Sequence, residues 1–149
     1  MTSFKKNNRG FTIVELLIVI VVIGILAALV IVTYNGIQQK ARDTERKTDI
    51  NALASHLEAY NASAGRYPTL ANVNDTTFRA ANMKGLPGDA LQDPKGAAQT
   101  LVDTAAANSY AYEPSPAGCD NTTTGGDCVS YVLTATLESG GTFVKQSSN

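Results

Sequence analysis

The most unusual chemical group in this sequence is a single carboxylate near its start. Between Phe11 and Val32 the only charged residue is Glu15. A carboxylate inside an apolar helix costs roughly 2.5–3.5 kcal/mol on membrane-insertion scales, so it is rare without a partner. Glu15 therefore needs either a route to water or a cation, and the stretch around it supplies no cation of its own.

The carboxylate of Glu15 could be satisfied in two ways. It lies about one helical turn into the apolar stretch, so in an isolated membrane helix its side chain reaches the polar interface. Once the helix is packed away from lipid headgroups, a cation must come from outside the stretch. A free amine, made by cutting the chain before Phe11 and offered by a neighbouring copy, is such a cation.

The other reactive side chains favour structure over catalysis. One histidine and two cysteines, Cys119 and Cys128, form no dense cluster of the zinc type. The sequence has no Walker loop, dinucleotide fingerprint, HExxH or GxSxG motif, so we expect no enzyme. Outside the cytoplasm the two cysteines are expected to form a disulfide, and in a reducing compartment they would be free thiols.

Oxygen ligands for calcium lie between the two cysteines. Asp120, Asn121 and Asp127 offer carboxylate and amide oxygens, which Ca²⁺ prefers. Their spacing does not match an EF-hand. We therefore expect no cofactor, with Ca²⁺ in this loop as the alternative.

The element that carries Glu15 is predicted to span a membrane. Residues 11–32 would form a helix of about 33 Å that is apolar on every face. Lys5, Lys6 and Arg9 precede it and predict a cytoplasmic N-terminus. Without these three cations, nine cations face thirteen acids, so the formal charge changes from -1 to -4. A secretory signal cut after the stretch is the alternative, but such signals have apolar regions of only about 7–15 residues.

The residues around Glu15 resemble the class III signal of type IV pilins and their relatives. A short basic leader is followed by Gly10-Phe-Thr-Ile-Val-Glu-Leu16, and Ile23-Gly-Ile-Leu-Ala-Ala28 is similar to a second signature of that family. The resemblance implies that a prepilin peptidase cuts between Gly10 and Phe11 and methylates Phe11. It also implies that Thr12 and Glu15 act in the assembly and register of subunits.

The resemblance further implies where the chain goes and what it meets. It would be a prepilin in the cytoplasmic membrane and then a subunit of an extracellular surface filament. Its partners would be copies of itself in a helical homopolymer, the prepilin peptidase and, indirectly, the assembly platform and its ATPase. Only the filament would bind nucleic acid or a host surface.

The apolar stretch departs from the family where many relatives have a proline, since Val32 stands at that position. Two other weak points remain, at Gly24 and at Gly36. Glycine costs about 1 kcal/mol relative to alanine inside a helix. Our hypothesis is that the helix bends or melts near Gly24 or Gly36 in a filament.

Residues 35–64 are predicted to continue as an amphipathic helix. Apolar residues spaced three and four apart at positions 50, 53, 54 and 57 would pack against a small domain. Gly65 and Pro68 should end the helix, with Tyr67 packed over its end. The mixed charges of residues 40–49 either bridge neighbouring subunits or form local pairs.

The sequence of residues 65–149 predicts a globular head, in which a loop region is followed by an antiparallel sheet. We expect a short helix capped at Asn74 or Asp75 and a second near residues 101–107. A short strand is predicted at 110–112, ended by Pro114 and Pro116. Alternation predicts a second strand at 129–138, and a third is expected across a Gly-Gly turn at 142–145. The fold class is α+β, in the pilin "lollipop" arrangement. Its predicted parts are the leader 1–10, the transmembrane and filament-core helix 11–34, the amphipathic helix 35–64 and the head 65–149.

The resemblance and the pattern together favour a structural subunit of a type IV pilus, acting in motility, adhesion or DNA uptake. A pseudopilin of a type II secretion system is the alternative, since the turns between Leu86 and Gly96 are similar to those of pseudopilins. A membrane-anchored binding domain that never polymerises is the second alternative.

Overall fold

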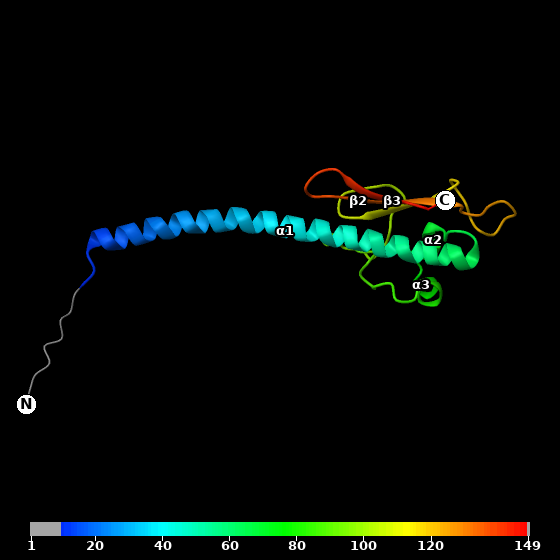
Figure 1. Ribbon diagram of the computed structural model, residues 1–149, viewed down its shortest axis with the longest axis horizontal. Coiled ribbons are helices and arrows are strands. Elements are labelled where there is room, and N and C mark those ends of the chain that lie inside the picture. The colour runs from blue at the N-terminus through cyan, green and yellow to red at the C-terminus, as the bar shows by residue number, and fades with distance from the viewer. Residues whose placement is uncertain (1–9, 149) are drawn as a thin grey trace, which may run out of the picture. The chain divides into compact units, whose positions relative to one another are not determined.

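The computed structural model describes residues 10–148, and its longest element is the helix α1, Ile13–Ala64 (Figure 1). Its 52 residues form one unbroken helix through both Gly24 and Gly36. The chain divides into two compact units between Gln38 and Gln39. The predicted leader lies outside the described residues, apart from Gly10.

The helix α1 ends within the predicted range because a glycine and a proline follow it. Gly65 has a φ of 73°, in the left-handed region that favours glycine, and its N–H donates to the carbonyl of Asn61 at 2.8 Å. Tyr67 is fully buried, and its hydroxyl donates to Glu58 in the last turns of α1 at 3.0 Å. Tyr67 therefore packs over the helix end, as predicted.

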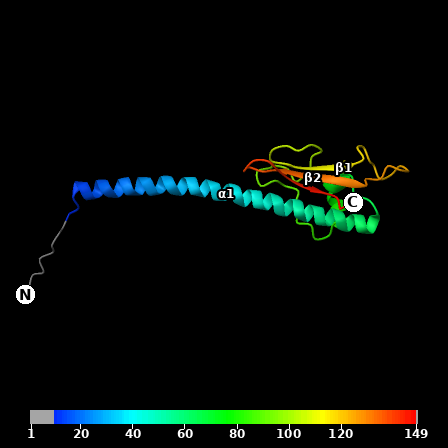
Figure 2. The ribbon, with the colours of Figure 1, turned by 45° about the horizontal axis from the view of Figure 1, so that its top comes forward.

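The second unit is built on one face of α1. Ile50, Leu53 and Leu57 are fully buried, at the three- and four-residue spacing that places them on one stripe of a helix. They share a core with side chains from the strands and loops, chiefly Tyr67, Tyr110, Tyr112, Tyr131 and Leu133. Figure 2 shows the strands on one side of this part of α1.

The sheet has three antiparallel strands in the order β1-β2-β3, with bounds Tyr110–Ser115, Ser130–Thr136 and Thr142–Gln146. All three lie where alternation predicted strands, and the α+β class is confirmed. Of the two prolines predicted to end the first strand, Pro116 directly follows its last residue, Ser115. Pro114 does not end it, because it lies within β1 and pairs with Tyr131. β1 is an edge strand, where proline is tolerated since its missing N–H interrupts no ladder.

Two short helices precede the sheet, α2 at Leu70–Asn74 and α3 at Thr76–Asn82. Asp75 caps α3 by accepting a hydrogen bond from the Thr77 N–H at 2.8 Å, so the predicted capped helix is confirmed. The prediction of a helix near residues 101–107 is wrong. Val102 instead pairs in parallel with Ala111 beside β1, because the sheet edge takes up its backbone hydrogen bonds.

Candidate processing and assembly site

The start of α1 is closed by a capping box between Thr12 and Glu15. The N–H and the hydroxyl of Thr12 both donate to Oε2 of Glu15, at 2.8 and 2.7 Å, and the Glu15 N–H donates back to the Thr12 hydroxyl at 3.2 Å. Such reciprocal bonds satisfy N–H groups that a helix start would otherwise leave unpaired. The signal was visible in the sequence as a Thr and a Glu three residues apart, and our sequence reasoning missed it.

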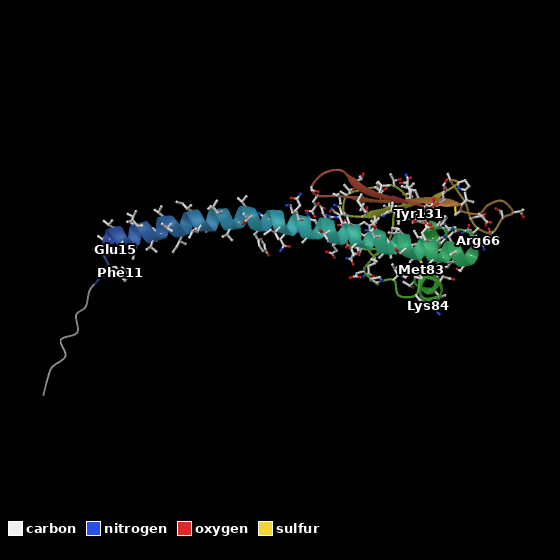
Figure 3. The ribbon with its side chains drawn as sticks, viewed as in Figure 1. Phe11, Glu15, Arg66, Met83, Lys84 and Tyr131 are labelled. Carbon is white, nitrogen blue, oxygen red and sulfur yellow. A yellow bond between two sulfur atoms is a disulfide. The ribbon has the colours of Figure 1, made fainter. Side chains whose placement is uncertain are left out.

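The capping box uses only one of the two oxygens of Glu15. Within residues 10–148, no hydrogen bond or ion pair reaches Oε1. The carboxylate lies at the tip of α1 beside Phe11 (Figure 3). Glu15 therefore completes its own helix start and still presents an acceptor to a second group.

The peptide bond between Gly10 and Phe11 lies outside the helix. Residues 10–12 have no regular structure, and Phe11 is 86% exposed. A Cβ built on Gly10 would meet nothing within 4 Å. Because α1 begins only at Ile13, this bond is open to a peptidase, which needs an accessible and unfolded segment.

The first part of α1 exposes its apolar side chains on every face. The large hydrophobic residues from Phe11 to Ile37 are between 47% and 86% exposed. By length and composition α1 is able to cross a membrane. An all-round apolar surface of this size has to be covered by lipid or by other apolar helices.

No contact within the described residues requires a glycine at position 24 or 36. A Cβ built on either glycine would have no neighbour within 4 Å. Neither position requires glycine for its backbone conformation, since both lie within a regular helix with negative φ. A glycine at these positions could therefore serve to weaken the helix. It could also allow close approach by a second helix, since small residues are favoured where helices pack in membranes. The bending hypothesis concerns a filament and stays a prediction.

Cys119 and Cys128 are joined in a disulfide, as predicted. Asn121 holds the enclosed loop to the body of the head. Its amide donates to the carbonyl of Tyr67 at 2.7 Å, and its side-chain oxygen accepts from the Cys128 N–H at 2.8 Å. The loop is thus fastened beside the segment that follows α1.

The proposed calcium ligands of this loop have protein partners. The carboxylate of Asp120 accepts hydrogen bonds from the backbone N–H groups of Thr122 and Thr123, which lower its pKa to about 2. Asp127 forms an ion pair with Arg66 at 3.0 Å. Within the described chain, no three acidic, histidine or cysteine side chains gather in a metal-binding arrangement.

A hollow in the head lies beside β1. It has a volume of about 730 Å³ and is lined by Thr69, Asp103, Tyr112, Glu113 and Cys119 among others. The Tyr112 hydroxyl donates to the carbonyl of Pro68 at 2.6 Å, and Cys119 is in the disulfide. This lining pairs no nucleophile with a base.

The charges of residues 40–49 divide into two groups. Arg42, Asp43 and Arg46 form ion pairs within their own unit. Lys40, Glu45 and Lys47 are exposed, and no ion pair within residues 10–148 includes them. Apart from the pair of Arg46 with Asp43, the first group pairs with residues 47 or more positions away, which neither alternative predicted. Bridging of neighbouring subunits by the second group stays a prediction.

Comparison with known proteins decides the nature of the N-terminal segment. Residues 5–31 match the family described as the prokaryotic N-terminal methylation motif. The chain carries a prepilin-type N-terminus. This segment contains the bond between Gly10 and Phe11 and the capping box, and it ends within the apolar part of α1.

The curated relatives of this chain are of two kinds, a type IV pilin and type II secretion proteins. It is 38% identical over 72 residues to the type IV major pilin protein PilA of Myxococcus xanthus, covering 48% of this chain and 33% of the relative. It is 42% identical over 65 residues to the type II secretion system core protein G of Dickeya chrysanthemi, covering 44% of this chain and 42% of the relative. The corresponding protein of Aeromonas hydrophila is 42% identical over 65 residues, covering 44% of this chain and 46% of the relative.

The similarity therefore spans less than half of this chain and less than half of each of these relatives. No solved structure matches the chain. The chain resembles both type IV pilins and type II secretion core proteins G, and these likenesses do not choose between them.

Proposed function

We propose that this chain is a structural subunit of a type IV pilus, with no catalytic activity of its own. In this proposal it is cut after Gly10, methylated at Phe11 and assembled through α1 into a helical surface filament. One observation carries the proposal. The apolar part of α1 exposes every large side chain, and its single carboxylate stands beside the predicted cut with one oxygen unused.

The apolar part of α1 would have two successive surroundings. Lipid covers it while the chain is a prepilin in the cytoplasmic membrane, and other copies of α1 cover it in the filament. The hydrophobic effect does not favour this transfer, since lipid is already apolar. An ATP-driven assembly platform therefore supplies the work.

In the filament core Glu15 would be removed from water and would need a cation. The new amine of Phe11 on a neighbouring copy is the candidate, and Oε1 is the oxygen that the capping box leaves free. A buried ion pair of this kind is better attested as a register device than as a net source of stability. Thr12 would contribute by holding the carboxylate in place.

A pseudopilin of a type II secretion system is the second candidate. The likeness to core protein G of several bacteria favours it. The turns between Leu86 and Gly96 favour it as well. The disulfide-closed loop at residues 119–128 favours a surface pilus instead, since a covalent closure suits an exposed extracellular head.

Further parts of the proposal concern ligands and roles. The head would work without a cofactor, since the oxygens of Asp120, Asn121 and Asp127 already have protein partners. Titration of the full chain with Ca²⁺ would test this by calorimetry. Motility, adhesion and DNA uptake would be properties of the assembled filament.

The test is recovery of filaments sheared from cells that express either the native chain or Glu15→Ala. The native chain should yield filaments visible by electron microscopy. Glu15→Ala should reach the membrane and be cut normally, with filaments lost or strongly reduced. Normal filament numbers in Glu15→Ala would refute the role of Glu15. A native chain that is cut and methylated but gives no surface filaments would favour the pseudopilin, and an uncut chain would favour a simple membrane anchor.

A further inference from the structure

Part of α1 is held to the head by charge instead of apolar contact. Between Gln39 and Asp49 the only buried residues of α1 are Asp43 and Arg46, at 5% and 1% exposure. The first buried apolar side chain is Ile50. Almost three turns of the helix within the second unit therefore depend on polar contacts for their attachment.

Arg46 is the centre of these contacts. Its guanidinium binds Asp93 with two hydrogen bonds, from Nε at 2.6 Å and from Nη2 at 3.0 Å, and both side chains are 1% exposed. Its Nη1 donates to Asp43 at 2.8 Å and to Glu138 at 3.0 Å. Paired charge-assisted hydrogen bonds of this kind are directional and strong.

A second set of bonds ties the same turns of α1 to the β2–β3 turn. Arg42 binds both oxygens of Glu138 at 2.7 Å. Asp43 accepts the backbone N–H groups of Glu138 and Ser139, at 2.9 and 3.0 Å. The Arg42 guanidinium lowers the pKa of Glu138 to about 2, so this carboxylate stays charged at any neutral pH.

Four residues with low helix preference lie among the turns where these bonds form. Thr44, Thr48, Asp43 and Asp49 are all poor helix formers. The hydroxyls of Thr44 and Thr48 donate to the carbonyls four residues before them, at 2.8 and 3.0 Å, a bond that slightly destabilises and bends helices. The other seven residues of 39–49 are good helix formers, so these four lower the helix preference of the turns only in part.

We propose that the ion cluster of Arg42, Asp43, Arg46, Asp93 and Glu138 is a clasp that keeps α1 helical from Arg42 onward. Any melting of α1 is then confined to residues before the clasp, which include Gly24 and Gly36. The role of the clasp in a filament rests on the proposed function, because melting of α1 matters only when subunits pack together. The clasp itself does not depend on that function, because all its bonds lie within one chain.

The polar chemistry suits a clasp better than an apolar contact would. Apolar surfaces attract without direction, so a helix held only by them can rotate or slide. The bidentate pairs of Arg42 and Arg46 accept one orientation of the helix relative to Asp93 and Glu138. The cluster therefore holds both the helical state and the rotation of these turns.

The test is amide hydrogen exchange of the unassembled full chain in detergent micelles. In the native chain the amides of residues 42–48 should be protected. Glu138→Gln should raise their exchange rates by at least about tenfold, because it removes the charge that accepts hydrogen bonds from both Arg42 and Arg46. Amides of residues 50–57, above the apolar core, should change by less than about twofold. Arg42→Lys keeps the charge, loses the bidentate geometry and should give the same pattern.

Asp127→Asn is the matched control, since it breaks the ion pair with Arg66 elsewhere in the head and should leave residues 42–48 unchanged. Unprotected amides at 42–48 in the native chain would overturn the clasp, as would unchanged rates in both variants. An equal rise over residues 42–57 would overturn it too, since the cluster would then be part of general head stability. The measurement involves no filament, so it stands or fails separately from the proposed function.

Discussion

Thr12 and Glu15 bind each other through a single carboxylate oxygen. The backbone N–H and hydroxyl of Thr12 meet at Oε2 of Glu15, at 2.8 and 2.7 Å. One glutamate can therefore serve two purposes at once, by starting its own helix through Oε2 and by receiving a neighbouring amine through Oε1. Because an amide oxygen can serve the first purpose and only a charge serves the second fully, the two are separable by substitution.

Glu15→Gln should preserve the helix start and still abolish filaments. Glutamine is accepted in a capping box but offers no charge to an amine. Thr12→Val should weaken the helix start by about 1 kcal/mol, since it removes the capping hydroxyl. It should reduce filament yield less than Glu15→Gln does, because the carboxylate keeps its charge and loses only the group that holds it in place. The measurement is the yield of sheared filaments, with membrane and cleaved fractions quantified alongside. Equal assembly by native and Glu15→Gln chains would show that the charge of Glu15 is not needed.

Arg46→Met should destabilise the head by about 3–5 kcal/mol, because Asp93 is left buried without a cation. Adding Asp93→Asn should recover part of this loss, since the buried charge is then removed. Urea unfolding of the full chain in detergent would measure both variants. If the double variant were no more stable than Arg46→Met, the loss would not arise from the uncompensated carboxylate.

Removing the disulfide should lower the free energy of unfolding by about 2–3 kcal/mol, the loop-closure value for cysteines nine residues apart. The variant is Cys119→Ser with Cys128→Ser, followed by near-ultraviolet circular dichroism of the buried tyrosines. The native chain under reducing conditions is the control and should behave in the same way. An unchanged unfolding midpoint would mean that Asn121 and its neighbours hold the loop without the bond.

Asp49 should make the head less stable as the pH rises. Burial raises the pKa of Asp49 to about 6, against the lowering effect of its 2.7 Å hydrogen bond from Tyr110 and with the help of nearby Glu45 and Asp89. A carboxyl group with a raised pKa binds its proton more tightly in the folded state. Its stabilising effect is therefore complete below about pH 4 and is lost as the pH rises through about 6.

Asp49→Asn should accordingly raise the melting temperature at pH 7–8, and the gain should shrink toward pH 4. Asp103→Asn, an exposed change, is the control. Thermal unfolding of the full chain in detergent at several pH values would measure both. A gain that is the same at every pH would contradict a role for the ionisation of Asp49.

The parts of the fold that the sequence predicted depend on short-range patterns. The apolar stretch, the stop at Gly65 and the alternation in β2 each involve neighbouring residues. The helix expected at residues 101–107 failed because tertiary pairing of Val102 with Ala111 overrode a weak local preference. The strand β1 continued past Pro114 because only the assembled sheet makes it an edge strand.

In the candidate site and the clasp, too, features marked by local motifs were predictable and features made by long-range contacts were not. The cut, the carboxylate and the disulfide are marked by local motifs, and the capping box could have been found from the three-residue spacing of Thr12 and Glu15. The clasp could not, since Arg46 meets Asp93 across 47 residues and Glu138 across 92. Their charges look like any solvated helix face until the fold brings them together.

The most direct measurement of cleavage and assembly is the mass of this chain's N-terminal peptide, recovered from sheared surface filaments. We predict a peptide that begins at Phe11 and carries one methyl group on its amine. Absence of the chain from the filaments, or a peptide that still begins at Met1, would contradict the account.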